Sequence, residues 1–432
     1  MFPKDLFALD IGTTKFCLAT LRERHGHTTP NVEIIGVPAM GMKKGMLANF
    51  AQAQKTLNAL LQSAEKHFGC DIRRVAVGVA GSHLQGRKIQ ASIEVPGQII
   101  QNNTVQKLIE KVEELASQEN REILHVVPVS YRIDSRESID DPVSFSGKML
   151  YGEFFVIDAD RLYLKDLVRL CNETGLEVSR LISEPFASAS VTVLDSHKES
   201  GVILADIGGG TTDGLVFRDS KPCAIFTINI AGTLMTSDLA IGLGLPREEA
   251  ERVKVFFGLL PVKKRSDQKV ELAQKVDETV FEVKDVNGVS KVISWKDIYP
   301  ILMPRVRELT TALQQKIQPF RNSMGAGVLL TGGGAEVLGI ELFMTKWLGA
   351  GVRKIKPASP LTFLSSVNMP THATMPTNVQ GRLREEFAMK YATVLGLLNL
   401  ELLRLGIQDV PKKNSLPFRY LRSFKNWFKE MS

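Results

Sequence analysis

Two stretches of the chain, far apart in sequence, repeat the same pattern of residue types. Residues 6–21 read LFALDIGTTKFCLATL and residues 202–217 read VILADIGGGTTDGLVF; each passes from an apolar run through Asp-Ile-Gly and Thr-Thr into a second apolar run. Two such runs around a glycine turn predict a β-hairpin. A hairpin that recurs after about 200 residues predicts two related halves of a larger fold rather than a solenoid of short repeats.

The length and composition indicate a globular protein with several domains. A chain of 432 residues is too long for one hydrophobic core. The N-terminus lacks the pattern of a signal peptide, and no stretch of about 18 apolar residues predicts a transmembrane helix. The four cysteines form no CxxC pair, so they indicate buried thiols in a reducing cytoplasm rather than disulfides or zinc ligands.

The glycine-rich turns point to phosphate, because backbone amides left free at a strand bend can bind it. Either hairpin alone could be an ordinary type I′ turn, which Asp and Gly favour for local reasons. A third loop, VLLTGGGAEV at residues 328–337, leads another strand into three glycines. We expect it to open a helix whose N-terminus suits an anion or the edge of a nucleoside. The expected phosphate-binding residues are Gly12, Thr13, Thr14, Gly208, Gly209, Gly210 and Thr211.

One aspartate ends the first strand of each hairpin. Asp10 and Asp206 cannot contact phosphate directly, because like charges repel. They are suited to a Mg²⁺ ion, which keeps several waters and takes few carboxylates, so we expect them to bind the metal through water. The chain has no GxxxxGK[ST] sequence, and its glycine spacing fails the GxGxxG pattern. The prediction is a nucleotide site that is neither a P-loop nor a dinucleotide-binding fold.

Together, the three loops resemble the phosphate 1, phosphate 2 and adenosine motifs of the actin, heat-shock chaperone and sugar-kinase ATPase superfamily. Within it, the chain is most similar to the bacterial cell-division family FtsA. The segments HVVPVSYRID at 125–134 and SIDDPVSFSGKML at 138–150 resemble that family, as do GTLMTSDLAIGLGLPREEAERVKVFFG at 232–258 and the basic C-terminal tail. The resemblance covers residues 5–260, 300–355 and 385–432.

The resemblance implies an α/β, actin-like two-lobed fold with duplicated RNase H-like cores, an inserted subdomain called 1C, and a C-terminal amphipathic helix. We expect subdomain 1A at 1–84 and 164–197, 1C at 85–163, 2A at 198–245 and 322–407, and 2B at 246–321. A linker at 408–415 would lead to a membrane-targeting helix at 416–431.

The resemblance also implies roles for single residues. Glu184 and Asp213 would position an attacking water, and Thr13, Thr14 and Thr211 would contact phosphates. The expected cofactor-binding set is completed by Lys15, Thr212, Glu251, Lys254, Gly332, Gly333 and Gly334. Glu251 and Lys254 would meet the ribose and base, although an exposed i,i+3 pair explains their spacing equally well. Arg305 matches a position that binds the C-terminal peptide of the tubulin-like protein FtsZ.

The tail holds most of the net charge of +7, because residues 412–432 carry six basic residues against one acidic residue. On a helix its apolar and basic residues separate, which is typical of a helix lying at a lipid interface. One face carries Tyr420, Leu421, Phe424, Trp427, Phe428 and Met431, and the opposite side carries Arg419, Arg422, Lys425 and Lys429. Phe418 is also among the residues expected to meet the membrane. Docking on the chain's own body and binding in a calmodulin-like groove are the alternatives. The aromatic stripe disfavours nucleic acid.

We therefore expect an ATP- and Mg²⁺-binding protein with at most slow ATPase activity, located on the cytoplasmic face of the cell membrane at the division site. By resemblance it would tether FtsZ filaments to an anionic membrane surface, self-polymerise into filaments, and recruit other division proteins through residues 85–163. The alternatives are a small-molecule kinase of the same superfamily, a heat-shock-type chaperone and a pilus-assembly actin-like protein. The chain has no β-rich peptide-binding domain, which disfavours the chaperone.

Overall fold

The computed structural model describes residues 6–22, 31–260, 262–266, 269–272, 280–357 and 389–405. The predicted linker at 408–415 and the predicted membrane helix at 416–431 lie outside these residues. Within the described ranges, no helix is both long enough and apolar enough to cross a bilayer.

The first half of the predicted repeat forms a five-stranded sheet in the order β11-β6-β1-β2-β3. Its apolar runs are buried, since all five residues of β1 lie in the core. The helix α1 (Phe50–Phe68) packs on β2 and β3, and α3 (Arg161–Glu173) packs on β11. Asn49 caps the start of α1, and Gly69, in the left-handed conformation, ends it. The strands are β1 (Phe7–Ile11), β2 (Lys15–Arg22), β3 (Asn31–Pro38), β6 (Arg74–Val79) and β11 (Glu177–Ser183).

The second half forms a sheet with the same arrangement, in the order β20-β19-β12-β13-β14. In both sheets the hairpin strands pair antiparallel, and the first hairpin strand also pairs parallel with a later strand. The identical order and strand directions confirm the duplicated core that the repeated motif predicts. The strands are β12 (Val202–Ile207), β13 (Thr212–Arg218), β14 (Lys221–Ile228), β19 (Val328–Thr331) and β20 (Val352–Lys354).

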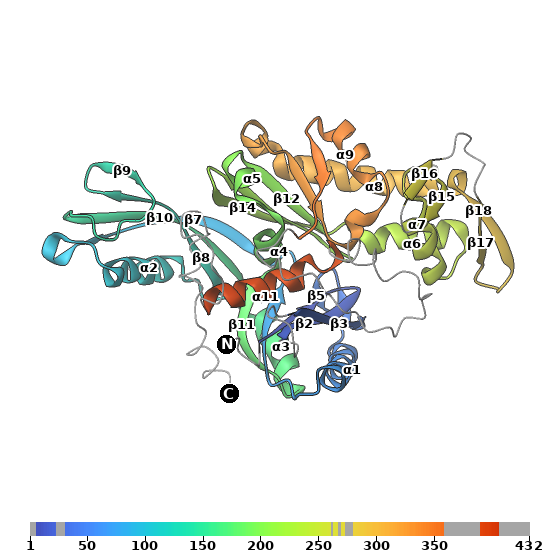
Figure 1. Ribbon diagram of the computed structural model, residues 1–432, viewed down its shortest axis with the longest axis horizontal. Helices are drawn as coiled ribbons and strands as arrows, with labels where there is room; N and C mark the ends of the chain where they lie inside the picture. The colour runs from blue at the N-terminus through green and yellow to red at the C-terminus, as the bar shows by residue number, and fades with distance from the viewer. Residues whose placement is uncertain are drawn as a thin grey trace.

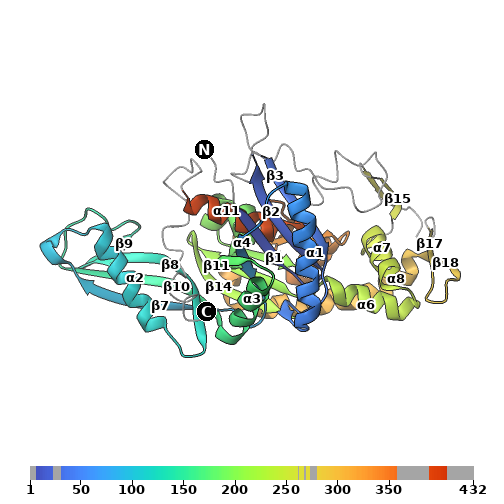
Figure 2. The ribbon, with the colours of Figure 1, turned by 90° about the horizontal axis from the view of Figure 1, so that it is seen from below.

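An inserted subdomain leaves the first lobe after β6 and returns before α3, which confirms the predicted insertion. Its sheet has the order β7-β10-β8-β9, and α2 (Asn102–Ala116) covers one face with a separate apolar core. Figure 1 and Figure 2 both show this subdomain projecting from one end of the molecule. Its elements are β7 (Gln85–Glu94), η1 (Pro96–Gln98), β8 (Arg121–Ile133), β9 (Arg136–Ile139) and β10 (Met149–Asp160).

At the opposite end of the molecule, α6, α7 and α8 pack together beside two short hairpins (Figure 1). In the second hairpin Val283 and Ile293 are buried, whereas Val280 and Val292 on its outer face are exposed. Because both faces carry apolar residues, the sequence there shows no clear alternation. The elements are α6 (Gly232–Leu243), α7 (Arg247–Phe257), β15 (Val262–Ser266), β16 (Lys269–Leu272), β17 (Val280–Lys284), β18 (Ser290–Ser294) and α8 (Trp295–Ile317).

Two helices, α4 (Glu184–Thr192) and α11 (Ala392–Arg404), pack against one another at the junction of the two lobes (Figure 1). The predicted boundary of 322–407 placed α11 in the second lobe, but α11 contacts β1, β2 and β6 of the first sheet. A buried ion pair of 3.2 Å between Arg180 and Glu401 also ties it to β11. The described chain is completed by β4 (Met42–Lys43), β5 (Met46–Leu47), α5 (Asp195–Glu199), η2 (Gln318–Ser323), η3 (Gly333–Glu336) and α9 (Ile340–Leu348).

The close approach of α4 and α11 depends on Gly396, where a Cβ atom would overlap the carbonyl oxygen of Ala187. Alanine is the better helix former by about 1 kcal/mol, so propensity alone would make Gly396→Ala stabilising. We expect it instead to lower the free energy of unfolding by about 2 kcal/mol, because overpacking forces the helices apart. Urea unfolding measures the change. Gly351→Ala is the control, since its Cβ would meet no atom within 4 Å; an unchanged or more stable Gly396→Ala protein would contradict the packing.

Candidate functional site

The turns of the two hairpins have the same closing hydrogen bond and lie against each other. Gly12 N donates to Lys15 O at 3.0 Å, and Gly208 N donates to Thr211 O at 2.9 Å. A Cβ atom at Gly209 would overlap the Thr14 side chain. The same atom at Gly210 would overlap Thr13. Only glycine therefore permits this contact, and anything bound between the turns must separate them.

The amides of these turns are only partly available for an anion. The amides of Gly12 and Gly208 close their own hairpins, so their predicted role as phosphate donors is not supported by this geometry. Within the described part of the chain, the amides of Thr13, Thr14, Gly209 and Gly210 donate no hydrogen bond. These four amides, which lie at the facing tips, fit the phosphate-binding role that the sequence suggests.

The third glycine loop packs on the second hairpin. Gly332 has a φ of 85°, and a Cβ atom there would overlap the Asp206 carboxylate. A Cβ atom on Gly334 would collide with Ile207. The loop opens only the short 3₁₀ turn η3, and α9 begins later, at Ile340. The expectation that these glycines open a helix is therefore wrong, although they do lie beside the second hairpin.

Lys254 is buried beside the second hairpin, whereas its partner Glu251 is exposed, with a side-chain exposure of 49%. Lys254 is only 4% exposed and lies 2.7 Å from Glu251 Oε2. Its Nζ also donates to Thr236 Oγ1 at 3.0 Å and to Gly232 O at 3.3 Å. Gly232 N in turn donates to Gly208 O at 3.1 Å, which connects α6 to the second hairpin. Burial lowers the pKa of Lys254, and Glu251 opposes part of this fall.

Four carboxylates act on one another where the two lobes meet. Burial, and then the fields of Asp10, Asp213 and Asp206, hold the pKa of Glu184 well above its usual range. Burial also raises the pKa of Asp10 and of Asp206. Lys15 Nζ lies 3.6 Å from Asp10 Oδ2 and 5.3 Å from the centre of the Tyr391 ring. Burial acts to lower the pKa of Lys15, but the fields of Cys17 and Asp10 outweigh it and raise the pKa.

Hydroxyl groups orient two of these carboxylates, and sequence reasoning missed three of the four. Ser188 donates to Asp206 Oδ2 at 2.6 Å and Thr393 donates to the same oxygen at 3.3 Å. Asp213 accepts from Thr211 and from Thr227, each at 2.6 Å. Ser188, Thr227 and Thr393 come from separate elements outside the motifs. No sequence spacing connects them to the hairpins, so only the fold could identify them.

The expected metal contacts remain a prediction. Among the described residues, no three Cys, His, Asp or Glu side chains are close enough to hold a metal ion directly. The sequence places Asp10 and Asp206 around Mg²⁺ through water, and that placement stays a prediction. The excess of carboxylates over ammonium groups makes the site chemically suited to a cation.

Arg305 lies on α8, away from the two hairpins. Its guanidinium pairs with both carboxylate oxygens of Asp238 on α6, at 2.6 and 3.0 Å, and also pairs with Glu308. Asp238 and then Glu308 raise the pKa of Arg305. The residue is half-buried.

Comparisons with known proteins identify the family. A model described as "SHS2 domain inserted in FTSA" matches residues 81–158, and a model described as "Cell division protein FtsA" matches residues 203–375. The chain belongs to the FtsA family. It is 26% identical over 438 residues to cell division protein FtsA of Borreliella burgdorferi, covering 98% of this chain and 99% of that protein. It is 28% identical over 354 residues to FtsA of Escherichia coli strain K12, covering 78% of this chain and 80% of that protein.

Solved structures support the actin-like architecture of this FtsA-family chain. The PilM-PilN type IV pilus biogenesis complex matches with a TM-score of 0.61 at 18% identity, covering 92% of this chain and 98% of that one. MreB5 of Spiroplasma citri bound to ADP matches with a TM-score of 0.52 at 13% identity, covering 94% of this chain and 100% of that one. At these identities the likeness concerns the fold alone, and it confirms the predicted fold class.

The buried carboxylate of Asp213 should make stability depend on pH. Burial raises its pKa from 3.8 to about 6, so the folded state holds a proton that the unfolded state loses. The resulting contribution to stability is present at low pH and is lost as the pH rises through that window. Asp213→Asn removes it, so between about pH 4 and about pH 7 the wild type should lose about 3 kcal/mol more stability than the variant.

Urea unfolding of both proteins at several pH values measures this difference. Asp10, Asp206 and Glu184 remain in the variant, but the field of Asp213 raises the pKa of Glu184, so the comparison measures Asp213 together with this interaction. Parallel pH profiles for the two proteins would show that Asp213 titrates normally in the fold.

Proposed function

We propose that this FtsA-family chain binds Mg·ATP between its two lobes and tethers FtsZ filaments to the cytoplasmic face of the cell membrane. The observation that carries the nucleotide part is the convergence of three glycine loops with Lys254 and Glu251 on one hairpin end. Lys15 and the four tip amides, which donate no hydrogen bond to any described residue, supply donors for phosphates. Lys254 and Glu251 lie where the third loop can flank a nucleoside.

The contact between the hairpin tips suggests how ATP acts. A triphosphate between Thr13–Thr14 and Gly209–Gly210 must separate the tips, because the turns touch at these residues. Binding therefore favours a different angle between the lobes, which is a shift between two conformations of the chain. We propose that this shift favours self-association into actin-like filaments.

Hydrolysis would be slow in this arrangement. Glu184 and Asp213 are the candidates that orient water, but their raised pKa values favour the protonated form, which cannot accept a proton from water. Magnesium, when bound, would neutralise charge that develops on the phosphates. The main role of ATP would then be to set the conformation.

The membrane and partner contacts are proposed from the sequence. Residues 416–431 combine an aromatic face with Arg419, Arg422, Lys425 and Lys429, which suits an anionic surface. Arg305 would take part in binding the FtsZ C-terminal peptide, and Asp238 would present its guanidinium through two hydrogen bonds. The inserted subdomain would contact other division proteins.

A side chain at a hairpin tip should block the nucleotide. Gly210→Ala places a methyl group where the phosphate must approach the backbone amides, so we expect Mg·ATP affinity to fall by about tenfold or more. Isothermal titration calorimetry with Mg·ATP measures the affinity. Gly351→Ala should bind like the wild type. If Gly210→Ala binds Mg·ATP as tightly as the wild type, the phosphates do not bind at this position.

The tether should depend on two separate regions. On vesicles containing anionic lipid, the full chain should co-sediment and bring FtsZ with it. A chain lacking residues 412–432 should neither co-sediment nor bring FtsZ to the vesicles, because each basic residue near an anionic surface contributes about 1 kcal/mol to membrane binding. Arg305→Glu should stay on the vesicle and lose FtsZ, since the charge that meets the peptide is reversed.

The matched control for this experiment is Arg307→Glu, which makes the same charge change on the same helix. Arg307 stacks on Trp347 at 4.1 Å rather than pairing with Asp238. We expect it to retain both vesicle binding and FtsZ. Loss of FtsZ in both variants would indicate a general charge effect on α8, and vesicle binding without residues 412–432 would contradict the membrane role of the tail.

A further inference from the structure

The turn formed by residues 81–84 stands between the candidate site and the inserted subdomain. It follows β6 and leads directly into β7 at Gln85, and Leu84 N donates to Gly81 O at 3.1 Å. Gly81 has a φ of 112°, a conformation that favours glycine. This short segment is therefore both part of the lobe junction and the entry to the insert.

At its first end, the turn is bonded to the second lobe. Thr227 on β14 places its hydroxyl 3.2 Å from Gly81 O and 2.6 Å from Asp213 Oδ1. A hydroxyl has one hydrogen, so Thr227 can donate to only one of these oxygens at a time. The contact joins the candidate site in the second lobe to the turn in the first.

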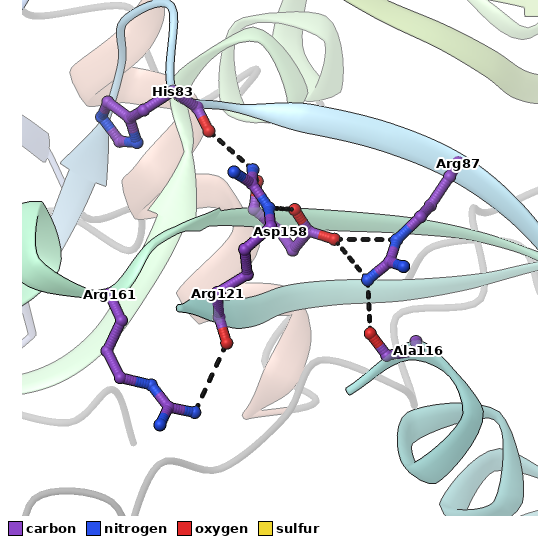
Figure 3. Close-up of polar contacts among 6 residues, drawn as sticks. All are labelled: His83, Arg87, Ala116, Arg121, Asp158 and Arg161. Atoms are coloured by element: carbon purple, nitrogen blue, oxygen red, sulfur yellow. Dashed lines mark hydrogen bonds and ion pairs between the residues drawn. The ribbon is translucent and has the colours of Figure 1, made fainter. Parts of the chain in front are cut away.

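At its other end, the turn is bonded to the base of the insert. Arg121 Nη2 on β8 donates to His83 O at 2.7 Å, and Arg121 Nε pairs with Asp158 on β10. Asp158 is completely buried and is also held by Arg87 on β7, at 2.8 Å. Figure 3 shows the carboxylate between the two guanidinium groups, with the His83 carbonyl beyond Arg121. Three strands of the insert thus meet at one buried charge.

The two ends differ in strength. The Arg121–Asp158 and Arg87–Asp158 contacts are charge-assisted and buried, whereas the Thr227–Gly81 contact joins neutral groups and is long. Charge-assisted hydrogen bonds are roughly twice as strong as neutral ones. The turn should therefore move with the insert, and the contact with Thr227 should be the one that changes when the lobes move.

We propose that residues 81–84 couple the nucleotide-dependent lobe movement to the position of the inserted subdomain, with Arg121 as the positioning residue. This inference rests on the proposed function, because ATP supplies the force that separates the hairpin tips. Separation breaks the contact between Thr227 and Gly81 O, and the released turn shifts together with β8, to which His83 O and Arg121 hold it. The insert would thereby report whether the site holds a nucleotide.

Hydrogen exchange measured by mass spectrometry tests this in the full chain, with and without the magnesium complex of a non-hydrolysable ATP analogue. In the wild type, the analogue should slow exchange at the hairpin tips and also change it at residues 116–122 and 153–160. Arg121→Lys keeps the charge next to Asp158 but cannot also reach His83 O in the same fork geometry. We expect its insert response to fall to roughly a third or less of the wild-type value, with the tip response retained.

Arg87→Lys is the matched control. It makes the same substitution on the same carboxylate, but Arg87 bonds to Ala116 O instead of to the turn. It should keep the insert response. Thr227→Val cuts the other end of the link, and it also removes a hydrogen bond to Asp213. It should lose the insert response as Arg121→Lys does, and this loss counts for the coupling where the tip response is retained. Thr310→Val, whose hydroxyl bonds only within α8, should not.

The outcomes separate this inference from the proposed function. A tip response in the wild type without an insert response would overturn the coupling, and so would a full insert response in both Arg121→Lys and Thr227→Val. Equal losses in Arg121→Lys and Arg87→Lys, with Thr227→Val unaffected, would show that the buried charge only stabilises the insert. If the tips do not respond in the wild type, the nucleotide proposal itself fails. If Arg121→Lys unfolds the insert, the coupling is judged from Thr227→Val alone: loss of its insert response supports the coupling, and a full response overturns it.

Discussion

The structure depends on a concentration of carboxyl groups where the two lobes meet, with Asp10 and Asp213 buried and Glu184 and Asp206 half-buried. Asp10, Glu184, Asp206 and Asp213 each have a raised pKa, for which burial is the largest cause, and Lys15 is the ammonium group paired with Asp10. Buried carboxylates are costly unless they are paired or hydrogen-bonded. The fold meets this cost with hydroxyl donors and with a site that suits a cation. The acids therefore belong to function more than to stability, since an apolar junction would hold the lobes together more easily.

The hydroxyls that satisfy these acids also connect the parts of the molecule. Thr393 brings α11 to Asp206, Ser188 brings α4 to the same oxygen, and Thr227 brings β14 to Asp213. The helices α4 and α11 also pack on each other at the lobe junction, and β14 also contacts the turn that leads into the insert. A change of charge or position at the acids is thus felt by several elements at once, through contacts that are individually weak.

The hairpins were predictable because the signal is local. A strand, a glycine turn and a second strand form within one short segment, so the repeated motif predicted two sheets with the same strand order. The lobe to which α11 belongs was not predictable, because it depends on contacts such as Arg180 with Glu401, which are 221 residues apart. The end of the third loop was misjudged for a related reason. Three glycines are compatible with a helix start, but Gly339, in the left-handed conformation, precedes α9 instead. For Glu251 and Lys254 the spacing was ambiguous, and the structure distinguishes them by the burial of Lys254 alone, since Glu251 is exposed.

The position of α11 connects the two halves of the proposed function. Tyr391, just before α11, lies beside Lys15. Thr393, in the first turn of α11, donates a hydrogen bond to Asp206. Near its last turn, Glu401 is held by Arg180 and Arg404, and the chain then continues toward the basic residues of the tail. A helix fixed at both ends transmits displacement along its axis with little loss, because its backbone hydrogen bonds keep it stiff. Movement of Asp206 relative to Lys15 would therefore act on the same helix from which the proposed membrane segment departs.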